Sequence, residues 1–242
     1  MTQLAATPKS APSSGRGFAR DALLIASALL MALTLYMVYF WAPTEQNLGV
    51  SQRIFYFHVP LGWIGMVSII IVAFASLMHL FTGRQRWDDL AYSTAELGVI
   101  YASLILVTGA IWGKPVWGVW WTWDPKLTTT LVLWFIYVAY LMIRAYGPMG
   151  SQGRRFASVI ALIGAIDAPI IYMASIWWRT AHPALNIGPA ADEAEAIGDS
   201  RIYITLLVSV VAFTVMYIAL LTERYALRKS ESDLDELHQR MA

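Results

Sequence analysis

Six long apolar runs are the feature that most constrains this chain, at about 22–41, 61–81, 90–111, 127–146, 157–177 and 202–222. A run of roughly 20 apolar residues makes a helix about 30 Å long, which matches the hydrocarbon thickness of a bilayer. Only 14% of the residues are charged, against roughly 25% in globular proteins. The sequence therefore predicts an all-α integral membrane protein with six transmembrane helices.

The distribution of Lys and Arg predicts the orientation of these spans, because cytoplasmic segments are enriched in both residues. An even number of spans places both termini on one side. The tails and the loops on that side carry 12 of the 17 Lys and Arg residues. Both termini are therefore predicted to be cytoplasmic, and the loops 42–60, 112–126 and 178–201 to face outside. The outer loops carry Arg53, Lys114, Lys126, Arg179 and Arg201.

The chain is predicted to consist of one membrane domain and two short tails. Residues 1–20 are rich in Pro, Ser and Gly, which is typical of a disordered cytoplasmic tail. Residues 21–223 form the six-span domain, and 224–242 form a cytoplasmic tail with a short polar helical pattern. Glu96 and Asp167 lie inside spans, where helix–helix bonding is the favoured role for an ionisable side chain.

Tryptophan is concentrated on the predicted outer side. Aromatic belts normally decorate both interfaces of a membrane protein, so a belt alone does not explain the asymmetry. A cover of lipid, of another protein or of a flat ligand is expected over so much aromatic surface. Nine of the 11 Trp residues lie at or near the outer face: Trp41, Trp63, Trp112, Trp117, Trp120, Trp121, Trp123, Trp177 and Trp178.

The densest Trp-rich segment is 112–126, which reads WGKPVWGVWWTWDPK. A short helix would place Trp117, Trp120 and Trp121 on one face. Two glycines, Gly113 and Gly118, would let a planar molecule approach the backbone closely. A Trp-rich outer loop that presents aromatic surface is predicted.

The residue Asp124 has a structural interpretation of its own. An Asp-Pro pair before an apolar run is typical of a helix N-cap with Pro at the first helical position. Asp124 is therefore predicted to cap the fourth span, a role that is compatible with a ligand contact.

Two of the four histidines, His58 and His182, lie on the predicted outer face and flank the Trp-rich segment. Two imidazoles are too few for a typical zinc site, and the acidic stretch 192–199 is interpreted first as a solvated loop. Haem iron needs only two axial ligands from the protein, and the absence of Cys excludes a covalent C-x-x-C-H haem. A non-covalently held haem b therefore fits these residues better than zinc does. Outer cations, above all Arg53, Lys126 and Arg179, are available to pair its propionates or lipid headgroups. His79 and His238 receive no role.

Several function classes find no support in the sequence. A net charge of +1 gives no electrostatic footprint for nucleic acid. No phosphate-binding loop of the form G-x-x-x-x-G-K-[ST] occurs, so any ATP-driven step is assigned to another subunit. No H-E-x-x-H or G-x-S-x-G motif points to hydrolysis. The chain is not expected to be an enzyme.

The segment WGKPVWGVWWTWDPKLTTTLVLW resembles the tryptophan-rich "WWD" haem-handling membrane proteins. With FHVPLGW before it and WWRTAHP after it, the chain is similar to the cytochrome c maturation protein C family of haem-delivery subunits. The resemblance implies that His58 and His182 are the axial ligands of the haem iron. It also implies porphyrin contacts from Trp117, Trp120, Trp121, Trp123 and Asp124.

The same resemblance implies a location and a set of partners. The location is the bacterial inner membrane, with the haem site facing the periplasm. The partners are the ATPase and membrane subunits of an ABC transporter, a small single-span subunit and a periplasmic haem chaperone that accepts the haem. Lys126 stands where the family pattern often has Arg, which removes a bidentate propionate contact.

Three alternatives stay open beside this interpretation. A system II-type haem exporter and synthetase shares the WWD segment but has more spans and a second histidine pair. A cytochrome b-type oxidoreductase subunit usually carries ligands inside its spans, often at two depths. A purely structural subunit would use its Trp surface to dock a partner.

Overall fold

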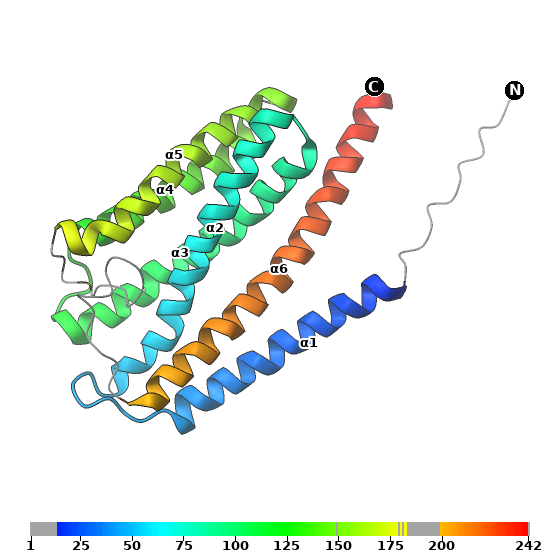
Figure 1. Cartoon of the computed structure of the whole chain (residues 1–242). Coiled ribbons are helices and arrows are strands. Elements are labelled where there is room, and N and C mark those ends of the chain that lie inside the picture. The colour runs from blue at the N-terminus through cyan, green and yellow to red at the C-terminus, as the bar shows by residue number, and fades with distance from the viewer. Residues whose placement is uncertain (1–13, 149, 179, 181, 183–198, 242) are drawn as a thin grey trace, which may run out of the picture.

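The computed structural model describes residues 14–148, 150–178, 180, 182 and 199–241, and nearly all of them are helical (Figure 1). The six long helices are α1 Ser14–Tyr36, α2 Phe55–Thr82, α3 Gln85–Trp117, α4 Pro125–Tyr146, α5 Gly150–Trp177 and α6 Ser200–Met241. A π-helical segment η1, Met37–Trp41, continues α1, and a 3₁₀ helix η2, Val50–Ile54, precedes α2. All six long helices are long and apolar enough to cross a membrane. The predicted fold class and its six spans are confirmed.

The helices pack as neighbouring pairs, α2 with α3, α4 with α5 and α1 with α6, and α2 joins the pairs through contacts with α5 and α6. Figure 1 shows α4 and α5 on one side of the bundle, α2 and α3 in the middle, and α6 and α1 on the other side. The start of α1 and the end of α6 lie at the same end of the bundle. The start of α2 and the end of α3 lie at the opposite end, so His58 and the Trp-rich segment share it.

Several helices extend beyond the predicted spans. Helix α2 begins at Phe55, which places His58 in its first turn instead of in a loop. Helix α3 continues to Trp117 and ends where Gly118 adopts a left-handed conformation with φ of 77°. The expectation of a short helix that joins Trp117, Trp120 and Trp121 is therefore wrong, because Gly118 breaks the helix after the first of them. Helix α1 already begins at Ser14, and α6 runs on through the C-terminal polar pattern to Met241.

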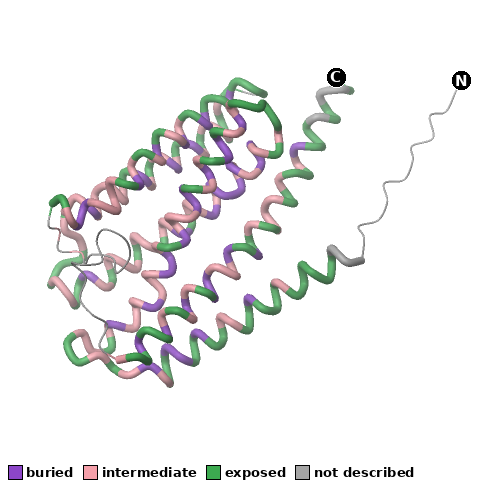
Figure 2. Tube along the Cα trace, in the orientation of Figure 1, coloured by how far each residue is buried: buried purple, intermediate pink, exposed green. Residues whose placement is uncertain are grey.

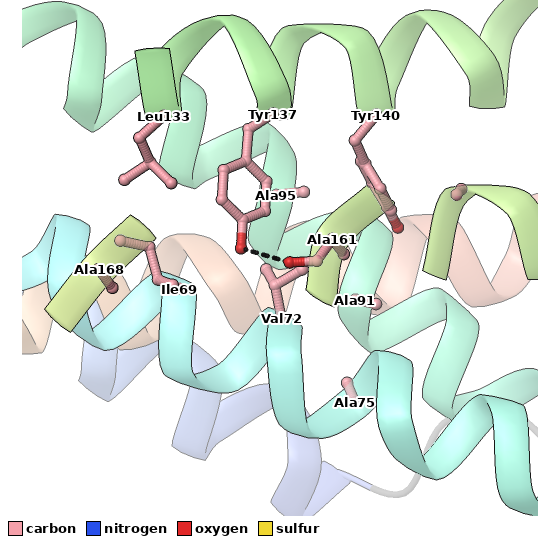
Figure 3. Close-up of a cluster of buried hydrophobic side chains, with 11 residues drawn as sticks. Ile69, Val72, Ala75, Ala91, Ala95, Leu133, Tyr137, Tyr140, Ala161 and Ala168 are labelled. Atoms are coloured by element: carbon pink, nitrogen blue, oxygen red, sulfur yellow. Dashed lines mark hydrogen bonds between the residues drawn. The ribbon is translucent and has the colours of Figure 1, made fainter. Parts of the chain in front are cut away.

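Small residues allow the central helices to approach one another closely. A cluster of buried side chains lies between these helices. Within it, Tyr137 of α4 donates a hydrogen bond to the Ala161 carbonyl of α5 at 3.3 Å (Figure 3). Many large apolar side chains are exposed, as expected for helices that face lipid. Figure 2 shows where the exposed residues lie along each helix. The cluster contains Ile69, Val72, Ala75, Ala91, Ala95, Leu133, Tyr137, Tyr140, Ala157, Ala161 and Ala168.

Ion pairs hold the helices together toward the end of the bundle where the termini lie. Arg144 of α4 contacts the buried Asp88 of α3 at 2.8 Å. Arg224 of α6 contacts Glu96 of α3 at 2.5 Å, so the predicted helix–helix role of Glu96 is confirmed. Asp167 differs, because its Oδ2 atom is buried without a hydrogen-bond partner in the described part of the chain. The predicted helix–helix role of Asp167 stays a prediction.

Candidate haem-binding site

The structure brings the two outer histidines side by side. His58 lies in the first turn of α2, and His182 follows the end of α5. Their ring centroids are 6.2 Å apart, with 40° between the ring planes, and both side chains are half-buried. Two segments that are distant in sequence therefore present two imidazoles to one point.

This separation suits two imidazoles on opposite sides of one metal ion. Metal–imidazole bonds are about 2 Å long. A five-membered ring with bonds of about 1.35 Å places each nitrogen about 1.1 Å from the ring centroid. Two rings that held one metal ion would therefore lie at most about 6.3 Å apart between centroids, and the observed separation is 6.2 Å. The angle between the ring planes is free to vary, because each ring can rotate about its metal bond.

Helix α3 supports His58 from behind. Thr108 Oγ1 lies 2.9 Å from His58 Nδ1, and the Trp112 ring packs edge-on against the imidazole with centroids 5.8 Å apart. At Gly109 an added Cβ would come within 3.1 Å of the His58 ring. Thr108, Gly109 and Trp112 were not among the predicted haem-binding residues. Residues 108 and 112 are one helical turn apart and share a helix face. This could have been noticed only if the predicted third span, 90–111, had been extended toward Trp117.

The tryptophans of the Trp-rich segment differ in how far they are packed and how far they are exposed. Trp117 packs over Gly113, where an added Cβ would lie 3.2 Å from the Trp117 ring, and against His182 with ring centroids 6.3 Å apart. Trp121 and Trp123 pack edge to face at 5.8 Å. Trp120 and Trp123 are 59% and 75% exposed and are free to cover a ligand. We call Trp117, Trp120, Trp121 and Trp123 the tryptophan surface.

The two glycines of this segment serve different purposes. The backbone of Gly113 is covered by the Trp117 ring, which needs the missing side chain in order to pack there. Gly118 ends α3, and no atom of the described residues beyond its chain neighbours lies within 4 Å of a Cβ added to it. An open backbone for a planar molecule is therefore found at Gly118.

The predicted capping role of Asp124 is confirmed. Its Oδ1 atom accepts a hydrogen bond from the Leu127 backbone N–H at 3.0 Å, and Pro125 begins α4. Oδ2 accepts a second hydrogen bond from the Thr122 hydroxyl at 3.2 Å. Asp124 therefore fixes the point at which the tryptophan surface joins α4.

The outer cations differ in their availability. Lys114 donates to the Gly118 carbonyl at 2.8 Å, where it closes the end of α3. Arg201 pairs with Asp199 at 3.0 Å, and hydrogen bonds from Arg201 hold the pKa of Asp199 below its ordinary value. Lys126 is buried and interacts electrostatically with His58. Arg53 lies over the Tyr39 ring at 5.7 Å.

One predicted cation, Arg179, lies outside the described residues, as does most of the acidic stretch 192–199.

Several buried N–H groups at the end of the bundle that holds His58 would suit an anionic ligand. Trp112 Nε1, Trp121 Nε1 and Arg53 Nε are buried and have no hydrogen-bond partner among the described residues. A buried donor without a partner is costly, so a carboxylate that accepted from these groups would be stabilised. Haem carries two such carboxylates, and its iron needs two axial ligands. The residues present therefore fit haem in both donor type and donor number.

Comparisons with known proteins agree with this chemistry. The model of the family described as "Heme exporter protein C" matches residues 1–238. A heme exporter protein C from Bradyrhizobium diazoefficiens is 32% identical over 198 residues, which cover 82% of this chain and 74% of the relative. The Escherichia coli K12 heme exporter protein C is 35% identical over 161 residues, 66% of this chain and 65% of the relative. A putative cytochrome c biosynthesis ccmC-like mitochondrial protein from Marchantia polymorpha is 34% identical over 158 residues, 65% of this chain and 67% of the relative.

Proposed function

The chain belongs to the heme exporter protein C family, and we propose that it holds haem b between His58 and His182 and delivers it for cytochrome c maturation. The single observation that carries this proposal is the 6.2 Å separation of the two imidazole rings. The haem is cargo that must leave again, so non-covalent binding suits the task. The sequence contains no Cys to form thioether bonds.

The surroundings of the histidines are proposed to bind the rest of the haem. Trp120, Trp121 and Trp123 would cover the porphyrin, beside Trp117 and the open backbone of Gly118. Arg53 and Lys126 are the cations proposed for the propionates, because Arg53 Nε is buried without a partner among the described residues and Lys126 interacts electrostatically with His58. Asp124 would act through its helix cap, which positions the tryptophan surface.

The family also supports a set of partners and a location. We propose that the chain works in the bacterial inner membrane with the ATPase and membrane subunits of an ABC transporter. A small single-span subunit and a periplasmic haem chaperone complete the proposed assembly. The chain itself would perform no bond-making chemistry, because its role is to bind, orient and release haem.

The alternatives fit the geometry less well. A cytochrome b-type subunit usually carries ligands inside its spans, often at two depths, whereas His58 and His182 meet at one end of the bundle. A system II-type exporter needs a second histidine pair. His79 instead lies buried with its Nδ1 atom 3.3 Å from the Arg84 carbonyl oxygen, and His238 is exposed on α6. Among the described residues, therefore, only one histidine pair is formed.

We expect the purified protein, supplied with haem, to show the absorption spectrum of a low-spin iron with two imidazole ligands. Two strong-field nitrogen ligands complete the six-coordinate iron, in the oxidised and in the reduced state. Acidified organic solvent should extract all of the haem, because no covalent bond holds it. A high-spin spectrum would contradict ligation by both histidines, and no binding of haem at all would contradict the proposed function and favour a structural subunit.

We also expect both termini to be cytoplasmic and the histidine pair to face the periplasm. The chain contains no Cys, so a single introduced thiol reports its own location without background. A membrane-impermeant thiol reagent should label Gln46→Cys in intact spheroplasts and should label Ser151→Cys only after lysis. Both side chains are exposed, and they lie at opposite ends of the bundle. The reverse labelling pattern would place the site on the cytoplasmic side and overturn the proposed orientation.

A further inference from the structure

We infer that Thr108 fixes the tautomer of His58, so that Nδ1 carries the proton and Nε2 carries the lone pair that binds iron. The inference rests on the proposed function for its consequence, although the tautomer itself belongs to the protein without haem. It makes Thr108 a positioning residue, since it would act on the haem only through His58.

The hydrogen bonds of the Thr108 hydroxyl carry the argument. Thr108 Oγ1 donates to the Leu104 carbonyl, one turn earlier in α3, at 2.7 Å, and the Ile105 carbonyl lies 3.3 Å away. A hydroxyl has a single hydrogen and two lone pairs. Two oxygens only 2.7 Å apart repel each other unless a hydrogen lies between them, and a carbonyl has none to give, so the Thr108 hydrogen points toward the α3 backbone. The hydroxyl oxygen therefore faces His58 Nδ1, 2.9 Å away, as an acceptor.

The tautomer follows from this assignment. A neutral imidazole carries one proton, so the nitrogen that donates to Thr108 is Nδ1 and the nitrogen with the free lone pair is Nε2. Only the lone pair can bind a metal ion. Histidine ligands commonly donate the other ring N–H to a protein acceptor, which fixes ring orientation and raises the basicity of the ligand.

Two neighbours on α3 restrict the ring to this orientation. Gly109 leaves the space that the His58 ring occupies, since a Cβ there would come within 3.1 Å of Cε1. Trp112 packs edge-on against the same ring. Thr108, Gly109 and Trp112 therefore hold the imidazole by one polar contact and two steric contacts, all from a single helix.

The test compares Thr108→Val, which keeps the shape and removes the hydroxyl, with Thr108→Ser, which restores it. Nitrogen-15 NMR of the haem-free protein labelled at histidine reports which ring nitrogen is protonated, and His58→Ala identifies the His58 signal. We expect protonated Nδ1 in the wild type and in Thr108→Ser, and a mixture of both tautomers in Thr108→Val. Loss of such supporting contacts typically lowers metal affinity by 10- to 100-fold. Haem should therefore dissociate roughly 10 to 100 times faster from Thr108→Val and at the wild-type rate from Thr108→Ser.

Thr222→Val is the matched control. Thr222 makes the same bond to the carbonyl four residues earlier, to Ile218 at 2.7 Å, but lies near the opposite end of the bundle. It should change neither readout. An unchanged His58 tautomer in Thr108→Val would overturn the inference even if the protein binds haem. Failure of the wild type to bind haem would overturn the proposed function, and the NMR measurement would still decide the tautomer.

Discussion

Replacing His58 or His182 with Gly should remove the low-spin six-coordinate spectrum and leave less haem bound, and replacing both should leave almost none. Each imidazole would supply one of the two axial bonds, and the two ring centroids lie 6.2 Å apart. Each Gly also leaves space for a free imidazole molecule. Added imidazole should therefore partly restore the six-coordinate spectrum of each single variant.

The controls for this experiment are His79→Ala and His238→Ala, which should keep the wild-type spectrum. Gly in the first turn of α2 also costs helix stability, about 1 kcal/mol relative to Ala. Spectra must therefore be compared at equal amounts of folded protein. If both single variants bound haem with unchanged spectra, neither histidine would be a ligand and the proposed function would lose the observation that carries it.

The six spans and the meeting of the two histidines could be expected from the sequence, because both depend on features that act over long stretches. A run of apolar residues decides whether a helix crosses the bilayer, whatever its neighbours are. Because each span crosses the bilayer once, every second loop lies on the same side. His58 and His182 were therefore assigned to one face without any knowledge of packing.

The local details could not be predicted in the same way. The end of α3 depends on the left-handed conformation of Gly118, which overrides the helical spacing of Trp117, Trp120 and Trp121. The contact from Thr108 depends on how α2 packs on α3, and one sequence carries no direct record of that. Lys114 and Arg201 looked as available to a propionate as Arg53, because their hydrogen bonds form only in the folded chain.

The second large effect is expected at the tryptophan surface. Trp120→Ala should lower haem retention by roughly tenfold to a hundredfold. Burial and stacking of a large aromatic ring are worth on the order of 1–3 kcal/mol, and about 1.4 kcal/mol is a factor of ten. Trp120 is the cleaner choice than Trp117, because Trp117 packs against His182 and its loss would also disturb a proposed ligand. Trp120 is 59% exposed, so its removal leaves little of the fold unsupported.

The position of Trp120 also predicts which property should stay constant. Because stacking and the iron bonds are separate contributions, the haem that remains in Trp120→Ala should keep its six-coordinate spectrum. Phe81→Ala is the control, because it removes an exposed aromatic ring far from the proposed site. Phe81 is 78% exposed and lies at the other end of α2. The rate at which haem transfers to an excess of a haem-free acceptor protein measures haem retention in both variants. Equal rates in Trp120→Ala and Phe81→Ala would mean that lipid or a partner protein, not porphyrin, covers the tryptophan surface.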